Sequence, residues 1–322
     1  MAVLHYFFFT LRIDGEQMSY MSQGTKAVIK PPILTIVGFT GSGKTSIAGL
    51  FPKPAFIQAE DSQTVFQRTP VEFQPHFNPP LPRPHKDKKG NTAKNVSTRE
   101  VLIEQLMEFY TEDHQFETLV IDTATVINDL FEEEMVEFYP GVTSSIQDAA
   151  GGFQKAFDTI AKWHDDIINK CKKIRDKRNM AIVFLAHSSE RKKKNSPDVS
   201  GEYTVYSMRM HKKSEDVYIS HSDAILYLKQ TETMTGHVTD NKGNTTKRGR
   251  IRISDERVLI TSSDGTVGYV SAKNRYDMPQ EINVPKGTNP ILQYIPFYRD
   301  YVEQNGLLVP QDNEEIQEEV NE

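Results

Sequence analysis

The sequence has few of the residues that cross-link a protein or bind metals. Its single cysteine, Cys171, excludes internal disulfides and cysteine-based metal clusters, and suits a reducing cytoplasm. The nine histidines show no ligand spacing such as H-E-x-x-H. The apolar stretch 3–13 lacks the basic start and cleavage site of a signal peptide. No run of about 18 apolar residues occurs, so we expect a cytoplasmic protein with no membrane partner.

Charge is unevenly distributed along the 322 residues, whose net charge is −6. Residues 302–322 hold seven acidic and no basic side chains, which is typical of a disordered tail with either a solubilising or a regulatory role. Basic residues gather at 170–178, which we interpret as a solvated helix end, and at 191–194. We expect an N-terminal extension at 1–29, a core at 30–301 with a loop insertion at about 70–96, and an acidic tail at 302–322.

The segment VGFTGSGKTSIA (37–48) fits the phosphate-binding pattern G-x-x-x-x-G-K-[ST]. An apolar run at 33–37 predicts a buried strand before it, and a helix is expected after it. Glycines in such a loop let backbone N–H groups turn toward phosphates. Lys44 would reach the β- and γ-phosphates, and Thr45 would bind Mg²⁺. The predicted nucleotide-binding set is Gly38, Phe39, Thr40, Gly41, Ser42, Gly43, Lys44, Thr45 and Ser46.

Predicted strands and helices alternate downstream of this loop. Strands are expected at 55–61, 117–125 and 180–187, and helices at about 97–110, 124–138 and from 153 through 174. The first helix should pack through one side that consists of Leu102, Ile103, Leu106, Met107 and Tyr110. Further strands are expected at 222–229, 250–261 and 265–273. The order predicts an α/β fold with a mostly parallel central sheet, helices on both faces and a strand-rich C-terminal part.

Polar residues stand where the predicted strands end. Asp122 suits a contact with Mg²⁺ or its water, or else caps the following helix. Glu60 could accept the proton of an attacking water, and Asp61 beside it is the competing candidate. His187 follows the third strand and is either a γ-phosphate sensor or a structural residue.

The segment after His187, residues 188–213, is basic and contains spaced tyrosines. We expect a mobile loop, because such a composition buries little apolar surface. Cations bind nucleic-acid phosphates and rings stack on bases, so the segment is either a single-strand nucleic-acid surface or an ordinary solvated loop. The candidate nucleic-acid contacts are Arg191, Lys192, Lys193, Lys194, Tyr203 and Tyr206.

Taken in order, these segments resemble the RecA-like recombinase core, and in particular the shortened phage-encoded RecA-like ATP-binding proteins associated with single-strand annealing. The resemblance covers roughly residues 30–285. It implies ATP and Mg²⁺ as cofactors, Glu60 as the catalytic glutamate, Asp122 in the second Walker motif, and His187 where RecA has glutamine. Residues 139–152 and the segment after His187 take the places of the two DNA-binding loops.

The segment AKNRYDMP (272–279) resembles the part of RecA whose two basic residues reach the neighbouring subunit's ATP, here Lys273 and Arg275. The catalytic set implied by the resemblance is therefore Lys44, Glu60, His187, Lys273 and Arg275. The implied partners are single-stranded DNA, further copies of the chain in a ring or filament, and optionally a single-strand-binding protein. The long 70–95 loop and the lack of RecA's C-terminal domain depart from the family, so full strand exchange is not implied.

Other phosphate-loop classes fit the sequence less well. A regulatory GTPase needs N-K-x-D, whereas NKGN (241–244) lacks the Asp. A small-molecule kinase is the main alternative, because the basic run at 191–194 could imitate its lid. A non-catalytic nucleotide-binding assembly factor is the third reading. Stimulation of ATP turnover by single-stranded DNA would distinguish the first reading from both others.

Overall fold

The computed structural model describes residues 28–86, 95–138, 145–152, 154–196, 199–235, 238–239, 245–247, 250–262 and 272–307. Nearly all of the expected N-terminal extension and most of the expected acidic tail lie outside these ranges. Among the described residues, none of the helices has the length and apolar character needed to cross a bilayer.

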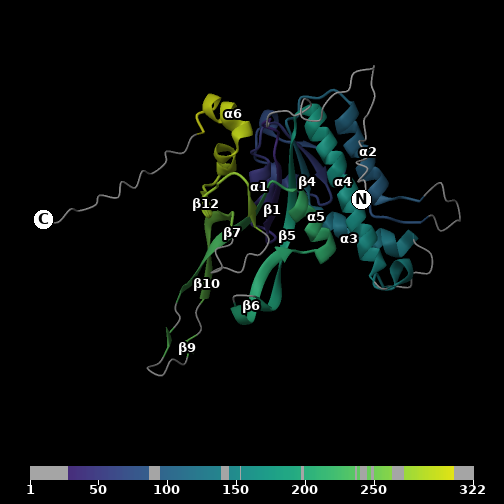
Figure 1. The fold of residues 1–322 in the computed structure, drawn as a ribbon. Helices are drawn as coiled ribbons and strands as arrows, with labels where there is room; N and C mark the ends of the chain where they lie inside the picture. The colour runs from purple at the N-terminus through teal and green to yellow at the C-terminus, as the bar shows by residue number, and fades with distance from the viewer. Residues whose placement is uncertain are drawn as a thin grey trace, which may run out of the picture.

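A mixed sheet forms the centre of the molecule, and ten of its strands lie in the described ranges (Figure 1). Its strands are β1 (Ile33–Gly38), β2 (Pro54–Gln58), β3 (His76–Phe77), β4 (Thr118–Asp122), β5 (Ala181–Ser196), β6 (Val199–Met208), β7 (Ala224–Thr235), β10 (Arg250–Ile260), β11 (Lys273–Asn274) and β12 (Glu281–Val284). The order is β12-β10-β7-β1-β5-β4-β2-β3, with β11 paired to β7 and β6 to β5. The run from β7 to β3 is parallel, while β6, β10, β11 and β12 pair antiparallel. A separate short pair, β8 (Val238–Thr239) and β9 (Thr245–Lys247), lies between β7 and β10 in the chain.

Helices cover both faces of the sheet, as the sequence predicts. The helices are α1 (Lys44–Ala48), α2 (Thr98–Thr111), α3 (Ala124–Phe138), α4 (Lys155–Arg178), α5 (Lys212–His221) and α6 (Arg299–Gln304). Side chains of α2–α5 share one hydrophobic core with one face of the strands, and side chains of α1 and α6 share a second core with the other face. All residues of β1 and β4 are buried, because a parallel strand between two helical layers exposes neither side.

The short 3-10 turns are η2 (Gln63–Phe66), η3 (Val71–Phe73), η5 (Ala149–Gly151), η6 (Pro290–Tyr294) and η7 (Pro296–Tyr298). The last two bring Ile291, Leu292 and Tyr298 into the same core as α1. Val302 of α6 is also buried there, so described structure continues past the expected start of the acidic tail.

The expected helices form, and their ends agree with the signals in the sequence. Ser97 caps α2, since its hydroxyl accepts from the Glu100 N–H at 3.1 Å. On α4, Ile160, Ile167 and Cys171 are buried at the predicted helical spacing. The packing side of α2 differs from the prediction, because Met107 is exposed and Phe109 is buried instead. The helix packs on α3 and α4 through the line that runs from Leu102 to Phe109.

The expectation of a loop at 188–213 is wrong. Strand β5 continues beyond the central sheet to Ser196 and pairs with β6 in an antiparallel hairpin, and α5 begins at Lys212. Val205 and Met208 are buried, so the hairpin has an apolar anchor that the basic composition of the segment conceals. In Figure 1 this hairpin and the strands β7–β10 extend from the same edge of the body.

Two other segments are more ordered or shorter than predicted. Within the expected 70–95 loop, β3 pairs with β2, and Leu81 is buried and donates its N–H to Gln58 O at 2.8 Å. Of the strand expected at 265–273, only Lys273 is described in a strand, where it pairs with Ile225, because residues 263–271 lie outside the described ranges.

Candidate functional site

The phosphate-binding segment lies where β1 ends and α1 begins. Gly41 and Gly43 adopt φ values of +81° and +95°, a backbone region that favours glycine. A Cβ atom on Gly38 would lie 2.5 Å from Leu228 O, so the neighbouring strand also requires glycine there. The loop therefore needs its glycines for geometric reasons as well as for close approach to a ligand.

Lys44 is folded back into this loop. Its side chain is buried, and Nζ donates to Gly38 O and Phe39 O, each at 3.0 Å. Burial lowers the pKa of Lys44 to about 8, against the opposing effect of the nearby Asp122 and Glu60 carboxylates. The buried Ser42 hydroxyl has no hydrogen-bond partner among the residues that the structure describes. A cation held by carbonyl oxygens and an unsatisfied hydroxyl suit a site that receives an anion such as a polyphosphate.

Thr45 and Asp122 face each other across the carboxyl edge of the sheet. The Thr45 hydroxyl donates to Asp122 Oδ2 at 3.0 Å. Asp122 is the last residue of β4 and is buried, which raises the pKa of its carboxyl group. In the described part of the chain, no group of three or more His, Cys, Asp and Glu side chains is placed to hold a metal. One carboxylate and one hydroxyl fit Mg²⁺, which takes its other ligands from substrate phosphates and water.

Glu60 lies two residues beyond β2 and is held by two side chains. Its Oε1 atom accepts from Thr123 Oγ1 at 3.0 Å and lies 2.6 Å from His187 Nε2. The hydrogen bond from His187 is the largest of the effects that lower the pKa of Glu60. The competing candidate, Asp61, is exposed and makes no hydrogen bond or ion pair with other described residues. The geometry thus gives a fixed position to Glu60 alone.

His187 joins the two halves of this site because β5 lies between β1 and β4 in the sheet. Its Nδ1 atom lies 3.4 Å from both Lys44 Nζ and Thr40 Oγ1, while Nε2 contacts Glu60. The His187 N–H also donates to Thr125 Oγ1 at 3.2 Å. A single imidazole therefore touches the phosphate loop on one side and the candidate base on the other. Thr123 and Thr125 were not predicted, although both stand in the segment that follows Asp122.

The predicted nucleic-acid residues have different environments within the β5–β6 hairpin. Arg191 pairs with the buried Glu215 at 3.1 Å and donates to the carbonyl oxygens of Met208 and Met210. Lys192 is exposed on the same strand. Lys193 pairs with Tyr203 across the hairpin, and Lys194 is the next residue of β5. The side chains of Lys193, Lys194 and Tyr203 lie outside the described part. Arg191 therefore has a structural partner, while Lys192 faces solvent.

Tyr206, on the other strand of the hairpin, contacts the phosphate loop directly. Its ring packs edge-on against Phe39 with centroids 5.6 Å apart, and both rings contact Tyr227 of β7. These aromatic residues line a pocket of about 520 Å³ together with Thr40 and Ser42. The hairpin and the loop thus share one packed contact.

Lys273 and Arg275 lie at the opposite edge of the sheet from this loop. Lys273 Nζ donates to Ile219 O of α5 at 2.9 Å, and Arg275 pairs at 3.1 Å with Asp223, the residue before β7. The guanidinium side chain is more than half exposed. Neither residue lies at the phosphate loop of its own subunit.

Three features lie together at the carboxyl edge of a mostly parallel sheet: a phosphate loop, a hydroxyl and a buried carboxylate that suit Mg²⁺, and a second carboxylate oriented by hydrogen bonds. Together they define a P-loop nucleotide-binding domain. In agreement, a family model described as an AAA domain matches residues 30–276. The chain belongs to this family, which makes it a P-loop ATPase domain of the AAA type. No curated protein matches the chain.

Proposed function

We propose that this protein is a Mg²⁺-dependent ATPase that uses ATP turnover to control its assembly on single-stranded DNA. The observation that carries the proposal is the position of β5. The same strand places His187 between Lys44 and Glu60 and then continues as one arm of the basic hairpin. Occupancy of the nucleotide site and the placement of the hairpin would therefore be coupled through a rigid element.

In the proposed reaction, each residue of the site has a separate task. Lys44 binds the phosphate oxygens, and Thr45 and Asp122 would hold Mg²⁺, which neutralises phosphate charge when it is bound. Glu60 is ionised at neutral pH, as an ordinary glutamate is, and the lowering of its pKa keeps it so; its carboxylate can therefore accept a proton from an attacking water. Thr123 and His187 keep its Oε1 atom oriented. His187 reports phosphate occupancy to both Glu60 and β5.

The proposed DNA surface is the hairpin, through Lys192, Lys193, Lys194 and the tyrosines. Its contact with Phe39 offers a second route from the phosphate loop to this surface, besides β5 itself. In this proposal Arg191 does not bind DNA, because its ion pair with Glu215 stabilises the hairpin. The biological setting that we infer from the resemblance to RecA-like proteins is phage recombination or annealing in the cytoplasm of the host cell.

The test measures ATP hydrolysis with and without single-stranded DNA. We expect DNA to stimulate the wild type, and Lys44→Ala to abolish turnover and tight ATP binding. Turnover that requires a small-molecule acceptor and ignores DNA would support a kinase instead. Tight binding without turnover would support an assembly factor.

The DNA surface is tested by replacing Lys192, Lys193 and Lys194 together with Ala. We expect weaker DNA binding and a salt dependence flattened by up to about 0.7 log units per lost phosphate contact. The matched control replaces three exposed lysines of α4, namely Lys162, Lys173 and Lys177. If both triple variants lose the same affinity and the same salt slope, the hairpin is not the DNA surface.

A further inference from the structure

Arg257 lies against Gly43 of the phosphate loop, although 214 positions separate the two residues in the sequence. It belongs to β10, and a Cβ atom built on Gly43 would lie 2.5 Å from its Nη1 atom and 2.7 Å from its central guanidinium carbon. Gly43 is the residue directly before Lys44. The lack of a side chain at this position therefore makes room for the Arg257 guanidinium as well as for a ligand.

The surroundings of Arg257 do not satisfy its charge. In the part of the chain that the structure describes, no carboxylate lies within ion-pair distance of its guanidinium, and the buried Nε atom has no hydrogen-bond partner. The loop that it contacts already holds the buried ammonium group of Lys44. Two cations converge on one short loop, and an anion between them would satisfy both.

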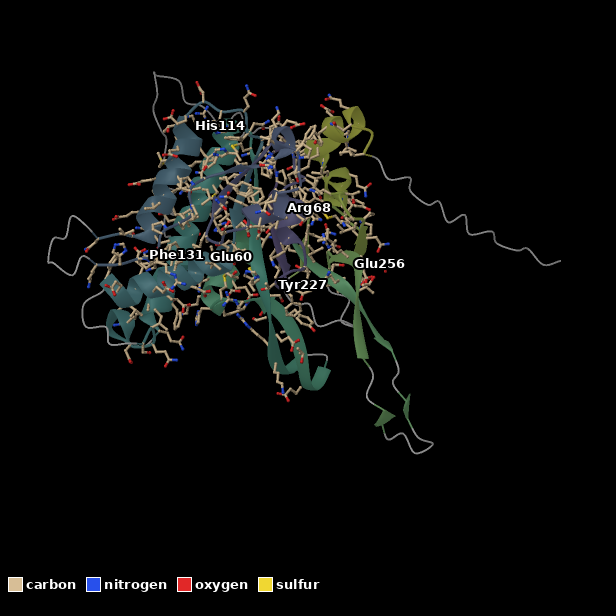
Figure 2. All side chains as sticks on the ribbon, turned by 180° about the vertical axis from the view of Figure 1, so that it is seen from behind. Glu60, Arg68, His114, Phe131, Tyr227 and Glu256 are labelled. Atoms are coloured by element: carbon tan, nitrogen blue, oxygen red, sulfur yellow. The ribbon has the colours of Figure 1, made fainter. Side chains whose placement is uncertain are left out.

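The order of the strands decides which part of a nucleotide Arg257 would meet. The residues of the proposed hydrolytic centre follow β5, β4 and β2, on one side of β1, whereas β10 and β12 lie on its other side. Figure 2 shows the same arrangement, with Glu60 and Glu256, the neighbour of Arg257, on opposite sides of Tyr227. Arg257 thus approaches the loop from the side away from Glu60 and His187.

A pocket continues from Arg257 in the same direction. It has a volume of about 470 Å³ and is lined by Glu256, Arg257, Asn283, Val284, Pro285 and Lys286. Pockets of this size accommodate small organic ligands. The guanidinium stands between this pocket and the phosphate loop.

We propose that Arg257 binds the α- and β-phosphates of the nucleotide held by the same subunit, as a second cation opposite Lys44. A guanidinium suits this task because its planar fork can bind two phosphate oxygens at once. The α- and β-phosphates are common to ATP and ADP, so Arg257 contributes to the affinity for both nucleotides. The inference rests on nucleotide binding under the proposed function, and it is independent of hydrolysis and of DNA.

The experiment compares Kd for ATP and for ADP, with Mg²⁺, in the wild type, Arg257→Ala and Arg257→Lys. We expect Arg257→Ala to raise the Kd for ATP and the Kd for ADP by a similar factor of about 10 to 100, which is the effect of losing a hydrogen bond to a charged group. Arg257→Lys should recover part of the affinity.

Lys286→Ala is the matched control, since Lys286 is an exposed cation of the same pocket. Thermal unfolding of every variant distinguishes a loss of nucleotide binding from a loss of folding. If Arg257→Ala is unstable, Arg257→Gln takes its place. Unchanged affinities in Arg257→Ala, a loss confined to ATP, or an equal loss in Lys286→Ala would each overturn the assignment. A wild type that binds neither nucleotide would instead overturn the proposed function itself.

Discussion

Two hydrogen bonds to one oxygen atom set the position of Glu60. Thr123 Oγ1 and His187 Nε2 both contact Oε1, which leaves Oε2 as the oxygen without a partner among the contacts of this site. A base that is held in this way does not have to be oriented again in each turnover. The entropic cost of orientation that is thereby avoided is a large part of catalytic efficiency. Asp61 has no comparable support, although it is adjacent in sequence.

We therefore predict that Glu60→Gln binds ATP and hydrolyses it at least about 100-fold more slowly, since a general base contributes a factor of this size. Single-turnover hydrolysis and equilibrium ATP binding would be measured on the same preparation. Asp61→Asn is the matched control and should stay close to the wild type. The assignment of the base is wrong if Asp61→Asn stops turnover and Glu60→Gln does not.

At the scale of elements, the helical layer contains a polar link that the sequence did not reveal. His164 of α4 lies 2.9 Å from the Tyr218 hydroxyl of α5 and 3.3 Å from Asn128 Oδ1 of α3. All three side chains are buried. Residue 164 lies on the same buried side of α4 as Ile160 and Ile167, but the spacing of apolar residues does not show that a histidine there would join three helices.

This link makes stability depend on pH. Burial lowers the pKa of His164 to about 3, whereas an unfolded histidine titrates near about 6.5. Between these values the unfolded chain binds a proton that the folded chain does not, so stability falls as pH falls from about 6.5 toward 3.

We predict that from pH 7 to pH 5 the wild type loses about 2 kcal/mol more unfolding free energy than His164→Gln, whose side chain does not titrate. Urea unfolding of both proteins at the two pH values measures the difference. Equal losses in the two proteins would contradict a neutral buried histidine.

The elements themselves were predictable where a short pattern determines them. The phosphate loop, the buried strands that end at Gly38 and Asp122, and the helix over 124–138 all follow from local periodicity. The hairpin of β5 and β6 was missed because its anchor residues, such as Val205, are few among many polar ones. Local sequence pattern does not predict a strand once that strand extends beyond the hydrophobic core.

The rest of the site depends on contacts between residues far apart in the chain. His187 and Glu60 are 127 residues apart in the sequence. To predict their contact, one would have to know that β5 lies between β1 and β4. No spacing rule brings Arg257 to Gly43. The predicted ends of the strands showed which polar residues lie at the same edge of the sheet. Which of these residues contact one another depends on the order of the strands, which the sequence did not give.

At the scale of the whole molecule, the candidate catalytic residues divide between two opposite edges of the sheet. Lys44, Glu60 and His187 lie at the carboxyl edge, where β1 Gly38 is level with β7 Leu228. Lys273 and Arg275 lie near the start of β7, since Asn274 pairs with Ala224. A subunit stacked on the next could bring one edge close to the other, which is the arrangement that the RecA resemblance implies.

Arg275→Ala should therefore bind ATP nearly normally as a monomer and lose DNA-stimulated hydrolysis and ordered assembly. The loss of rate could reach a factor of about 10³, as for other arginines supplied by a neighbouring molecule. Lys30→Ala is the matched control, because Lys30 is an exposed cation just before β1 whose partner is Asp176. It should retain both activities.

The two kinds of site variant make a sharper test when they are mixed. Glu60→Gln lacks the base and keeps Arg275, while Arg275→Ala keeps the base. In a mixed assembly some boundaries would pair an intact Glu60 with an intact Arg275, so the mixture should hydrolyse ATP faster than either variant alone. The gain should depend on the ratio of the two proteins. Under the proposed function it should also vanish when DNA is omitted, because the proposed assembly forms on DNA. If both variants are folded and no ratio restores activity, Arg275 acts within its own subunit, through its ion pair with Asp223.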